Sequence, residues 1–423
     1  MPNLKILHVN QSDCAGGAAI AAYRLHRGLL SEGIDSRLLV GEQKTSSDRV
    51  ARVPRRLRLE HQLSRLTRPM GLNYLNLVGS FDLPQHPVCQ SADLLNFHNL
   101  HAGYFNYAVL PRLTQNKPAV WTLHDMWAFT GHCAYSYDCD RWKTGCGRCP
   151  YPHIYPGIGT DNTRLEWKLK EWLYQRSTLT IVAPSRWLRD RARASLLSNF
   201  DIHHIPYGID LQAYQPLDPQ QCRSLLGIPA GKRVLMFAAE HLNEPRKGGD
   251  LLAASLDELP PSLKAETLLL TLGNGGEAMA EAVGMASLNL GYVGSDRLKA
   301  IAYSAADLFL FPTRADNLPL VLQESLACGT PMVSYKIGGV PDLVRPGVTG
   351  YLAEPENCRD FRQGIVELLD EGRDRLSQNC RAIAEKEYSL EQQTQRYLEL
   401  YYQVLKGQEL NLNRETVSDP NLV

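Results

Sequence analysis

Short apolar runs alternate with longer mixed segments along most of the chain. In the first half these runs occupy residues 4–9, 36–41, 92–98, 119–124 and 179–185. A second series occupies residues 232–240, 266–273, 288–294, 306–312 and 330–335. Continuous apolar runs of this length, each followed by a loop and a helix-like stretch, are typical of buried parallel strands joined by helices. The pattern predicts an α/β protein with two doubly wound, Rossmann-like domains.

A turn-rich segment separates the two series of runs. Residues 205–216 contain two prolines and one glycine, which favour a break in regular structure. We therefore expect an N-terminal domain over residues 1–205 and a second domain over 206–387. The segment at about 388–406 is helical in its choice of residues, whereas residues 407–423 are polar and predict a disordered tail.

Charge is distributed unevenly along a chain whose formal net charge is zero. Residues 1–205 hold 25 Lys and Arg against 16 Asp and Glu, and the remainder holds 20 against 29. A basic first domain suits an anionic partner such as a membrane leaflet, and we expect no nucleic-acid partner. No apolar stretch is long enough to span a bilayer and no signal peptide is apparent. We therefore expect a cytoplasmic protein, with the inner face of the membrane as a candidate position.

Two carboxylates bracket the segment that follows the apolar run at 306–312. Pro319 suits the first turn of a helix, and the free backbone N–H groups of that turn make residues 317–321 a candidate anion-binding site. Glu324 lies little more than one turn further on, where a carboxylate can accept hydrogen bonds from the vicinal hydroxyls of a ribose. With Asp316 at its start, this segment predicts a nucleotide-sugar site. The residues assigned to the N-terminal turn are Asn317, Leu318, Leu320 and Val321.

Two other turns offer groups that can bind a phosphate. Gly16 and Gly17 follow the first apolar run, and their lack of side chains lets an anion approach the helix expected from about Ala18. The alternative is a tight turn required only for packing. Arg246 and Lys247 lie in a loop before a helix, where two cations can neutralise a diphosphate without a metal ion. Such a pair is otherwise an ordinary solvated surface.

Histidines end two of the apolar runs in the first domain. His124 ends the run at 119–124 and is followed by Asp125. Open α/β sheets bind ligands at the carboxyl ends of their strands, so both residues are candidates for substrate contact. The alternative for His124 is a core histidine satisfied by a backbone carbonyl. His98, which ends the run at 92–98, is a second candidate.

Four cysteines are concentrated in one loop of the first domain. They are Cys133, Cys139, Cys146 and Cys149. The C-x2-C pair at the end is a usual chelating half-site, and four thiolates suit a structural zinc ion, although the first pair is more widely spaced than in common zinc ribbons. Disulfides and free thiols are the alternatives. We expect a zinc site that rigidifies the loop near His124.

Residues 52–68 combine arginines with leucines. The segment holds six Arg and one Glu, with leucines at positions 57, 59, 63 and 66. A helix of this kind can bind anionic lipid through its basic face and insert its leucines shallowly. The alternative is a solvated helix that packs its leucines on the domain. Pro54 limits where the helix can begin.

The segment from Asp316 onward resembles the donor domain of family 4 glycosyltransferases with the GT-B fold. The likeness rests on Asp316 and Glu324, on Gly-Thr-Pro at 329–331 and on Gly-Gly-Val-Pro at 338–341, and it extends over nearly the whole chain. The family usually has Glu where this chain has Asp316. The resemblance implies two Rossmann-like domains facing a cleft, with the C-terminal helix crossing back to the first domain.

The resemblance also implies a chemistry. It is the retaining transfer of a hexose from a nucleoside diphosphate sugar to an acceptor hydroxyl, in polysaccharide or lipid-linked glycan assembly, without a catalytic metal. Arg246 and Lys247 then bind the leaving diphosphate, Glu324 binds the ribose, and Asp316 and His124 position the sugar. UDP, GDP and ADP remain open as the nucleotide.

Weaker parts of the resemblance concern the rest of the donor site. Tyr292 and Val293 match positions that flank the base, the loop from Gly273 lies nearby in sequence, and Ser185 matches a donor contact. A catalytically silent binding subunit is the main alternative because of Asp316. A nicotinamide-dependent oxidoreductase is disfavoured, since no intact G-x-G-x-x-G follows the first strand.

Overall fold

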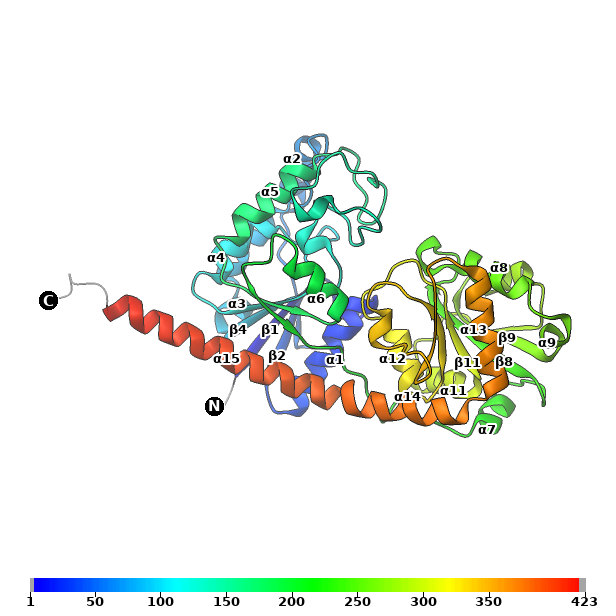
Figure 1. Cartoon of the computed structure of the whole chain (residues 1–423). Coiled ribbons are helices and arrows are strands. Elements are labelled where there is room, and N and C mark those ends of the chain that lie inside the picture. The colour runs from blue at the N-terminus through cyan, green and yellow to red at the C-terminus, as the bar shows by residue number, and fades with distance from the viewer. Residues whose placement is uncertain (1–3, 418–423) are drawn as a thin grey trace. The chain divides into compact units, whose positions relative to one another are not determined.

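The computed structural model describes residues 4–417, with side chains as far as residue 407. Within this range the chain forms two compact α/β units (Figure 1). The first comprises the chain up to Pro206 together with the segment from Glu391, and the second is Tyr207–Leu390. The last helix continues to Val417, so residues 407–417, which were expected to be disordered, are helical. The rest of that expected tail, residues 418–423, lies outside the described residues.

The first unit is built on a seven-stranded parallel sheet. Its order is β3-β2-β1-β4-β5-β6-β7. The strands are β1 Lys5–Ser12, β2 Asp35–Glu42, β3 Val50–Arg52, β4 Leu94–Phe97, β5 Ala119–Thr122, β6 Thr180–Ala183 and β7 Asp201–His204. The α-helices are α1 Gly17–Ser31, α2 Leu57–Thr67, α3 Pro87–Ser91, α4 Leu110–Thr114, α5 Thr163–Tyr174, α6 Arg186–Arg193 and α15 Leu390–Val417. Short 3-10 helices are η1 Val78–Gln85, η2 Tyr107–Val109, η3 Trp127–Phe129 and η4 Arg141–Lys143.

The second unit repeats this architecture with six parallel strands. Its order is β10-β9-β8-β11-β12-β13. The strands are β8 Arg233–His241, β9 Thr267–Asn274, β10 Ser287–Asn289, β11 Leu308–Phe311, β12 Met332–Tyr335 and β13 Gly350–Ala353. The helices are α7 Pro219–Leu225, α8 Gly249–Asp257, α9 Pro261–Glu266, α10 Gly276–Val283, α11 Asp296–Ala305, α12 Leu320–Ala327, α13 Cys358–Glu371, α14 Asp374–Glu387, η5 Pro245–Lys247 and η6 Val340–Asp342.

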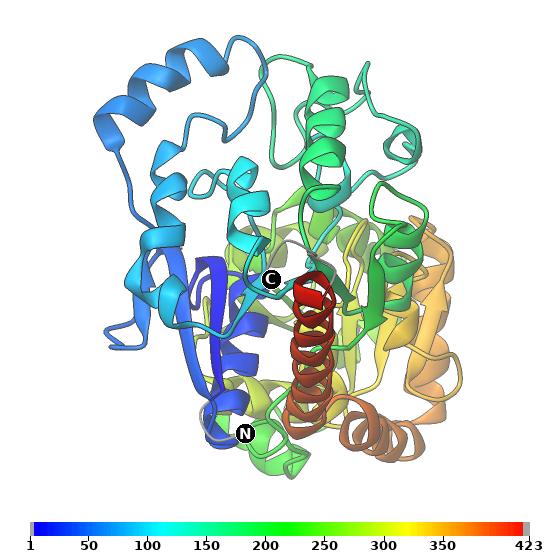
Figure 2. The ribbon, with the colours of Figure 1, turned by 90° about the vertical axis from the view of Figure 1, so that its left-hand side faces the viewer.

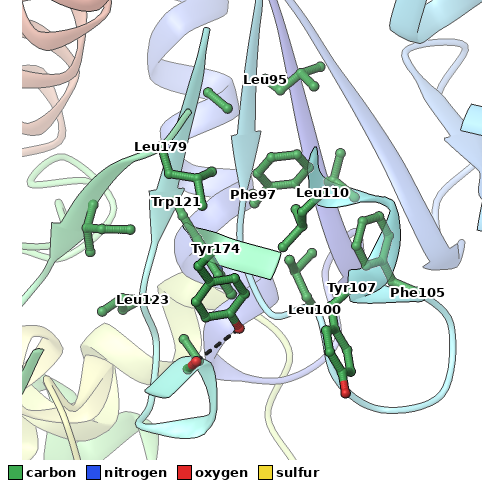
Figure 3. Packing of buried hydrophobic residues seen from close by; sticks show 14 of the residues in the cluster. Leu95, Phe97, Leu100, Phe105, Tyr107, Leu110, Trp121, Leu123, Tyr174 and Leu179 are labelled. Atoms are coloured by element: carbon green, nitrogen blue, oxygen red, sulfur yellow. Dashed lines mark hydrogen bonds between the residues drawn. The ribbon is translucent and has the colours of Figure 1, made fainter. Parts of the chain in front are cut away.

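The apolar runs become strands because both faces of each sheet are covered. Every residue of β4, β5, β11 and β12 is buried. A strand covered on both faces has no solvent-facing positions, so its residues are continuously apolar rather than alternating. Figure 3 shows Phe97 and Trp121 in this core beside Tyr174 of α5, whose hydroxyl donates to the carbonyl of Ala128 at 3.0 Å. The two predicted doubly wound domains are confirmed.

Helix α15 belongs to the core of the first unit (Figure 2). Tyr397 and Tyr401 are fully buried, and their hydroxyls meet side chains on the central strands. The amide of Asn96 donates to the Tyr401 hydroxyl at 2.7 Å, and Thr122 Oγ1 and the Tyr397 hydroxyl are 2.9 Å apart. The C-terminal segment therefore completes a sheet face formed by the N-terminal half of the chain.

Three strands have no counterpart among the apolar runs. These are β3, β7 and β13, which lie at edges of the two sheets. An edge strand has one neighbour and tolerates polar residues, as in the sequence Asp-Ile-His-His of β7. Among residues 4–417, no helix has both the length and the apolar character that crossing a bilayer requires.

Candidate functional site

The two cations of the second unit converge on one carboxylate. Arg246 and Lys247 lie in η5, between β8 and α8, and Asp316 follows β11. Lys247 Nζ donates to Asp316 Oδ2 at 2.8 Å, and Arg246 Nη1 donates to the same oxygen at 3.2 Å. Arg246 Nε also donates to Glu244 Oε1 at 2.9 Å. The structure thus brings together three of the residues predicted for the donor site.

Close backbone approach makes this convergence possible. Gly248 follows the cation pair with φ of +74°, and a Cβ there would lie 1.9 Å from the carbonyl oxygen of Pro312. Gly338, with φ of +52°, has the same relation to the carbonyl of Asp316, at 2.0 Å. Side chains at either position would push the loops apart. The loops after β8, β11 and β12 therefore pack directly against one another at the carboxyl ends of their strands.

The ionisation of Asp316 follows from its surroundings. Burial opposes the charged carboxylate, but Lys247 and Arg246 outweigh burial and lower its pKa below the usual range. The N–H of Asn317 donates to Asp316 Oδ1 at 3.0 Å and further favours the anion. Asp316 is thus an anion at neutral pH, and it neutralises part of the positive charge of the cation pair.

Helix α12 begins directly after this cluster. Pro319 is its N-cap residue rather than a member of its first turn, which corrects the expected position by one residue. The first backbone bonds of the helix run from Leu322 and Gln323 to the carbonyl of Pro319. The amides of Leu320 and Val321 precede these bonds, so they are the donors that a helix N-terminus presents to an anion.

Glu324 lies inside the second unit, one turn along α12. Its exposed fraction is 4%, and the hydroxyl of Tyr303 donates to its Oε2 at 3.3 Å. Asn317 and Leu318, between the two predicted carboxylates, are buried as well. A buried carboxylate held by a phenol is a preorganised acceptor for hydroxyl groups.

The predicted base-flanking segment is a loop and not a strand. Strand β10 ends at Asn289, so Tyr292 and Val293 follow it. Tyr292 is 66% exposed and Val293 is buried. The N–H of Gly273 donates to the carbonyl of Gly291 at 2.7 Å, which joins the glycine loop after β9 to this segment. The exposed ring leaves Tyr292 accessible for stacking.

The glycine turn of the first unit has the predicted form. Gly16 is the N-cap of α1, with φ of +86°, and α1 begins at Gly17. A Cβ at either glycine would have no atom within 4 Å. Asp13, which the sequence analysis did not select, accepts hydrogen bonds from the N–H groups of Lys44 and Thr45 at 2.9 and 2.8 Å. It ties the loop after β2 to the turn that carries the glycines.

His124 lies in a cluster of buried imidazoles after β4 and β5. His98 Nδ1 and His124 Nε2 are 2.9 Å apart, so the two histidine candidates are in direct contact. Burial lowers the pKa of His124 to about 4, and it is therefore neutral at neutral pH. Its neighbour Asp125 accepts hydrogen bonds from His101 Nε2 at 2.9 Å and from the N–H of Trp127 at 2.8 Å.

His101 was missed because it lies three residues beyond the apolar run that ends at His98. It lies in the loop that follows β4, at the carboxyl end of a central strand.

Ser185 has a local structural role in the first unit, since it is the N-cap of α6 and its Oγ accepts from the N–H of Leu188 at 3.1 Å. A Ser before a helix is itself a capping signal.

The predicted zinc site is not supported. Within residues 4–417, no group of three or more His, Cys, Asp or Glu is placed to hold a metal ion. The sulfur of Cys146 instead accepts from the N–H of Gly131 at 3.2 Å, and that of Cys149 lies 3.2 Å from His132 Nε2. Burial raises the pKa of Cys133 to about 12 and that of Cys146 to about 11, which favours neutral thiols. The wide spacing of the first pair is the feature that separates this loop from zinc ribbons.

Comparison with known proteins shows that each unit matches a known protein family. Residues 15–213 match the family described as Glycosyltransferase Family 4, and residues 232–371 match Glycosyl transferases group 1. A protein of Escherichia coli named as the colanic acid biosynthesis glycosyl transferase WcaC is 28% identical over 353 residues, or 78% of this chain and 83% of that protein. The D-inositol 3-phosphate glycosyltransferase of Thermobispora bispora is 33% identical over 184 residues, or 40% of this chain and 42% of the relative.

Solved structures share the fold over almost the whole chain. Sucrose-phosphate synthase from Thermosynechococcus elongatus has a TM-score of 0.70 at 18% identity, covering 95% of this chain and 100% of the other. HepE of Anabaena, solved in complex with UDP and glucose, has a TM-score of 0.69 at 17% identity with the same coverage. The chain belongs to glycosyltransferase family 4 and is a glycosyltransferase with the GT-B fold.

Proposed function

We propose that the protein is a retaining glycosyltransferase that moves a hexose from a nucleoside diphosphate sugar to an acceptor hydroxyl, in the assembly of a polysaccharide or lipid-linked glycan. The observation that carries this proposal is the convergence of Lys247 and Arg246 on Asp316 beside the N-terminus of α12. Glycosyl transfer leaves a diphosphate with growing negative charge. Paired cations and helix amides stabilise that charge without reorganising during the reaction.

The candidate residues of both units have separate parts in this proposed chemistry. Lys247 acts as a point charge on the diphosphate, and Arg246 bridges its oxygens. The amides of Leu320 and Val321 donate to the same group, and Glu324 accepts from the ribose hydroxyls. Asp316 positions the sugar together with His124, whose neutral ring contacts a hydroxyl group. Tyr292 and Val293 flank the base, and the glycine turn at Gly16 and Gly17 admits the ligand.

Catalysis depends on the cations in this proposal, and two substitutions test it. Lys247→Ala removes a charge that is needed most in the transition state, so kcat falls by about 100-fold or more. Glu324→Gln weakens donor binding and raises KM. Lys264→Ala is the control, because Lys264 forms only an exposed pair with Asp257 at 3.3 Å. Unchanged transfer rates in both variants, with the fold intact, contradict the assignment.

A ligand panel identifies the nucleotide. The melting temperature is measured with UDP, GDP and ADP and then with their sugars, since a ligand at a hundred times its Kd adds about 2.7 kcal/mol of stability. HepE was solved with UDP, which makes UDP the first to test. Donor binding without transfer or hydrolysis points to a binding subunit instead of an active enzyme.

We also propose that α2 brings the enzyme to the inner face of a membrane, where a lipid-linked acceptor resides. Leu57 and Leu66 are each 67% exposed, and the arginines of this helix are exposed too. Leu57 and Leu66 are therefore not packed on the domain, whereas Leu63 is half-buried. Glu60 is buried instead, and accepts from Arg55 Nε at 2.6 Å and from the N–H of Gly79 at 3.0 Å. One inward carboxylate thus anchors a helix whose basic and apolar side chains face outward.

A cavity beside α2 supports an acceptor role for this region. Its volume is about 830 Å3, and its lining includes Arg55, His61, Arg68 and Tyr74.

Flotation with vesicles of anionic and of neutral lipid tests the proposed contact between α2 and the membrane. Substituting Arg58, Arg65 and Arg68 by Ala abolishes flotation with anionic vesicles in this proposal. Substituting Arg359 and Arg375 of the second unit by Ala leaves it unchanged. Equal flotation of all three proteins contradicts the contact.

A further inference from the structure

Three buried imidazoles form an unbroken chain in the first unit. His8 Nδ1 lies 3.0 Å from His98 Nε2, and His98 Nδ1 lies 2.9 Å from His124 Nε2. The chain follows from the sheet, because β1 pairs with β4 and β4 pairs with β5. His98 directly follows β4 and His124 follows β5 by two residues. His98 thus contacts a neighbouring ring through both of its nitrogens, and His8 and His124 each contact His98 through one.

All three rings are neutral near pH 7. Burial lowers the pKa of His8 to about 3 and that of His124 to about 4, and it lowers the pKa of His98 well below the usual value. A neutral imidazole has one N–H donor and one lone pair. Two adjacent neutral rings can share a hydrogen bond in one of two directions only. In this chain, a choice of direction at one end sets the tautomers of all three rings.

The end of the chain at His8 selects the direction. His8 Nε2 is buried and has no hydrogen-bond partner within the described residues. If the chain ran from His124 to His8, this nitrogen would carry an unpaired buried N–H. Orphaned buried donors are rarer than under-satisfied acceptors in native proteins. The preferred direction therefore runs outward: His8 Nδ1–H donates to His98 Nε2, and His98 Nδ1–H donates to His124 Nε2.

We propose that His8 and His98 are positioning residues that hold His124 as its Nδ1–H tautomer. In this arrangement the Nε2 lone pair of His124 is occupied by His98, and Nδ1–H is the donor of the ring. His124 then recognises a sugar through an acceptor oxygen such as that of a hydroxyl group. The role in turnover rests on the proposed function, in which His124 contacts the transferred sugar.

The backbone around His98 is held independently of its ring. The N–H of His98 donates to the carbonyl of Val9 at 2.9 Å, and the indole of Trp121 donates to the carbonyl of His98 at 2.9 Å. Changes to the side chain of His98 therefore alter the chain of imidazoles without releasing the loop. Three substitutions separate its functions: Asn keeps a donor near the position of Nδ1, Leu removes it, and Asp offers only acceptors.

The direct measurement is the tautomer of His124. The full chain is labelled with 15N in its 12 histidines, and long-range 1H–15N spectra are recorded at pH 7.5, with His124→Asn used to assign the signals. The expected spectrum shows a protonated Nδ1 and an unprotonated Nε2 on His124 in the wild type and in His98→Asn. His98→Asp shifts the proton to Nε2. A wild-type His124 with the proton on Nε2 overturns the proposal, whatever the function of the protein.

Kinetics then separate the positioning role from the function of the site. His98→Leu lowers kcat by about tenfold, the effect of one lost hydrogen bond of ordinary strength, and His98→Asn restores most of it. The shift of melting temperature by the nucleotide alone stays unchanged, because the residues proposed to bind the diphosphate, the ribose and the base lie in the second unit. Wild-type turnover in His98→Leu overturns the positioning role. Wild-type turnover in His124→Asn shows that His124 takes no part in the reaction. The proposed positioning role of His8 and His98 in turnover is then overturned, whichever tautomer His124 has.

Discussion

Asp316 shows that a shorter carboxylate side chain can keep its contacts with a pair of cations. The family usually has Glu at this position, and the shorter carboxylate still contacts both Lys247 and Arg246. Gly338 lies close to the carbonyl of Asp316, where a Cβ would be 2.0 Å from the oxygen. The shorter side chain thus still places a charged carboxylate against both cations.

We predict that Asp316→Asn lowers kcat by about 100-fold, whereas Asp316→Glu stays within about tenfold of the wild type. The amide cannot compensate the charge of Lys247 or position the sugar as an anion does. Initial rates of transfer at saturating donor measure the effect. Asp250→Asn is the matched control, because Asp250 pairs with Arg314 at 2.7 Å on the surface of the same unit. Full activity of Asp316→Asn contradicts the role of this carboxylate.

Lys170 is the second residue whose environment makes a clear prediction. Its Nζ donates to the carbonyls of Trp127 and Thr130 at 2.6 and 2.9 Å, and lies 3.6 Å from the centre of the Trp127 ring. Burial lowers its pKa to about 8, although Glu166 favours its charged form. Glu166 in turn accepts from the hydroxyl of Tyr107. Removing one member of this buried set leaves the others without compensation.

We predict that Lys170→Met lowers the free energy of unfolding by about 3–5 kcal/mol. The double variant Lys170→Met with Glu166→Gln recovers part of this loss, because the remaining buried charge is also removed. Urea denaturation followed by fluorescence measures both. Lys168→Met, an exposed position on the same helix, is expected to change stability by less than about 0.5 kcal/mol. Equal stability of the two single variants is the contradicting outcome.

At the scale of elements, α15 is the part whose position is least apparent from its own sequence. It is amphipathic and helical, but its partners on β4 and β5 lie 305 and 275 residues away in the chain. Tyr397 and Tyr401 are buried among apolar residues, and each hydroxyl meets one polar side chain of the sheet. Loss of either hydroxyl leaves Asn96 or Thr122 with one fewer buried partner.

We predict that Tyr397→Phe combined with Tyr401→Phe lowers the free energy of unfolding by about 1–3 kcal/mol. The ring packing is preserved, so the loss measures the buried hydrogen bonds. Tyr402→Phe is the control, since Tyr402 is only half-buried. A double variant as stable as this control would show that the two hydroxyls contribute nothing to the docking of α15.

For the whole molecule, buried neutral histidines make the free energy of unfolding depend on pH. Burial lowers the pKa of His8 to about 3 and that of His26 and His124 to about 4, and His98 also lies well below its usual value. The unfolded chain takes up protons on these rings below about pH 6.5, whereas the folded chain does not. Stability is therefore fully present above pH 6.5 and declines as pH falls toward 4.

We predict a fall of about 1.4 kcal/mol per pH unit for each such proton between pH 6 and 5. Glu166, whose pKa burial raises, opposes this slope by at most one proton. The carboxylates with lowered pKa, Asp125 and Asp316, act at lower pH and do not account for this window. Urea midpoints at pH 7.5, 6 and 5 measure the slope. Midpoints that do not change between pH 7.5 and 5 contradict it.

Much of the geometry of the candidate donor site was predictable because its residues lie close together in sequence. The segment from Asp316 to Glu324 is one loop and one helix, so local geometry determines their spacing. The glycine turn at Gly16 has the same local character. The cysteine loop shows the opposite case: spacing alone predicted a metal site, but the folded loop gives Cys146 and Cys149 other partners.

The sequence by itself determined the two parallel sheets and the residues that follow their strands, because strands covered on both faces must be continuously apolar. It also determined the glycine turn between β1 and α1. Only the tertiary structure decided which of these residues meet: Lys247 with Asp316, His98 with His8 and His124, and α15 with β4 and β5. Such contacts depend on strand order, and strand order is a property of the whole sheet that no local pattern contains.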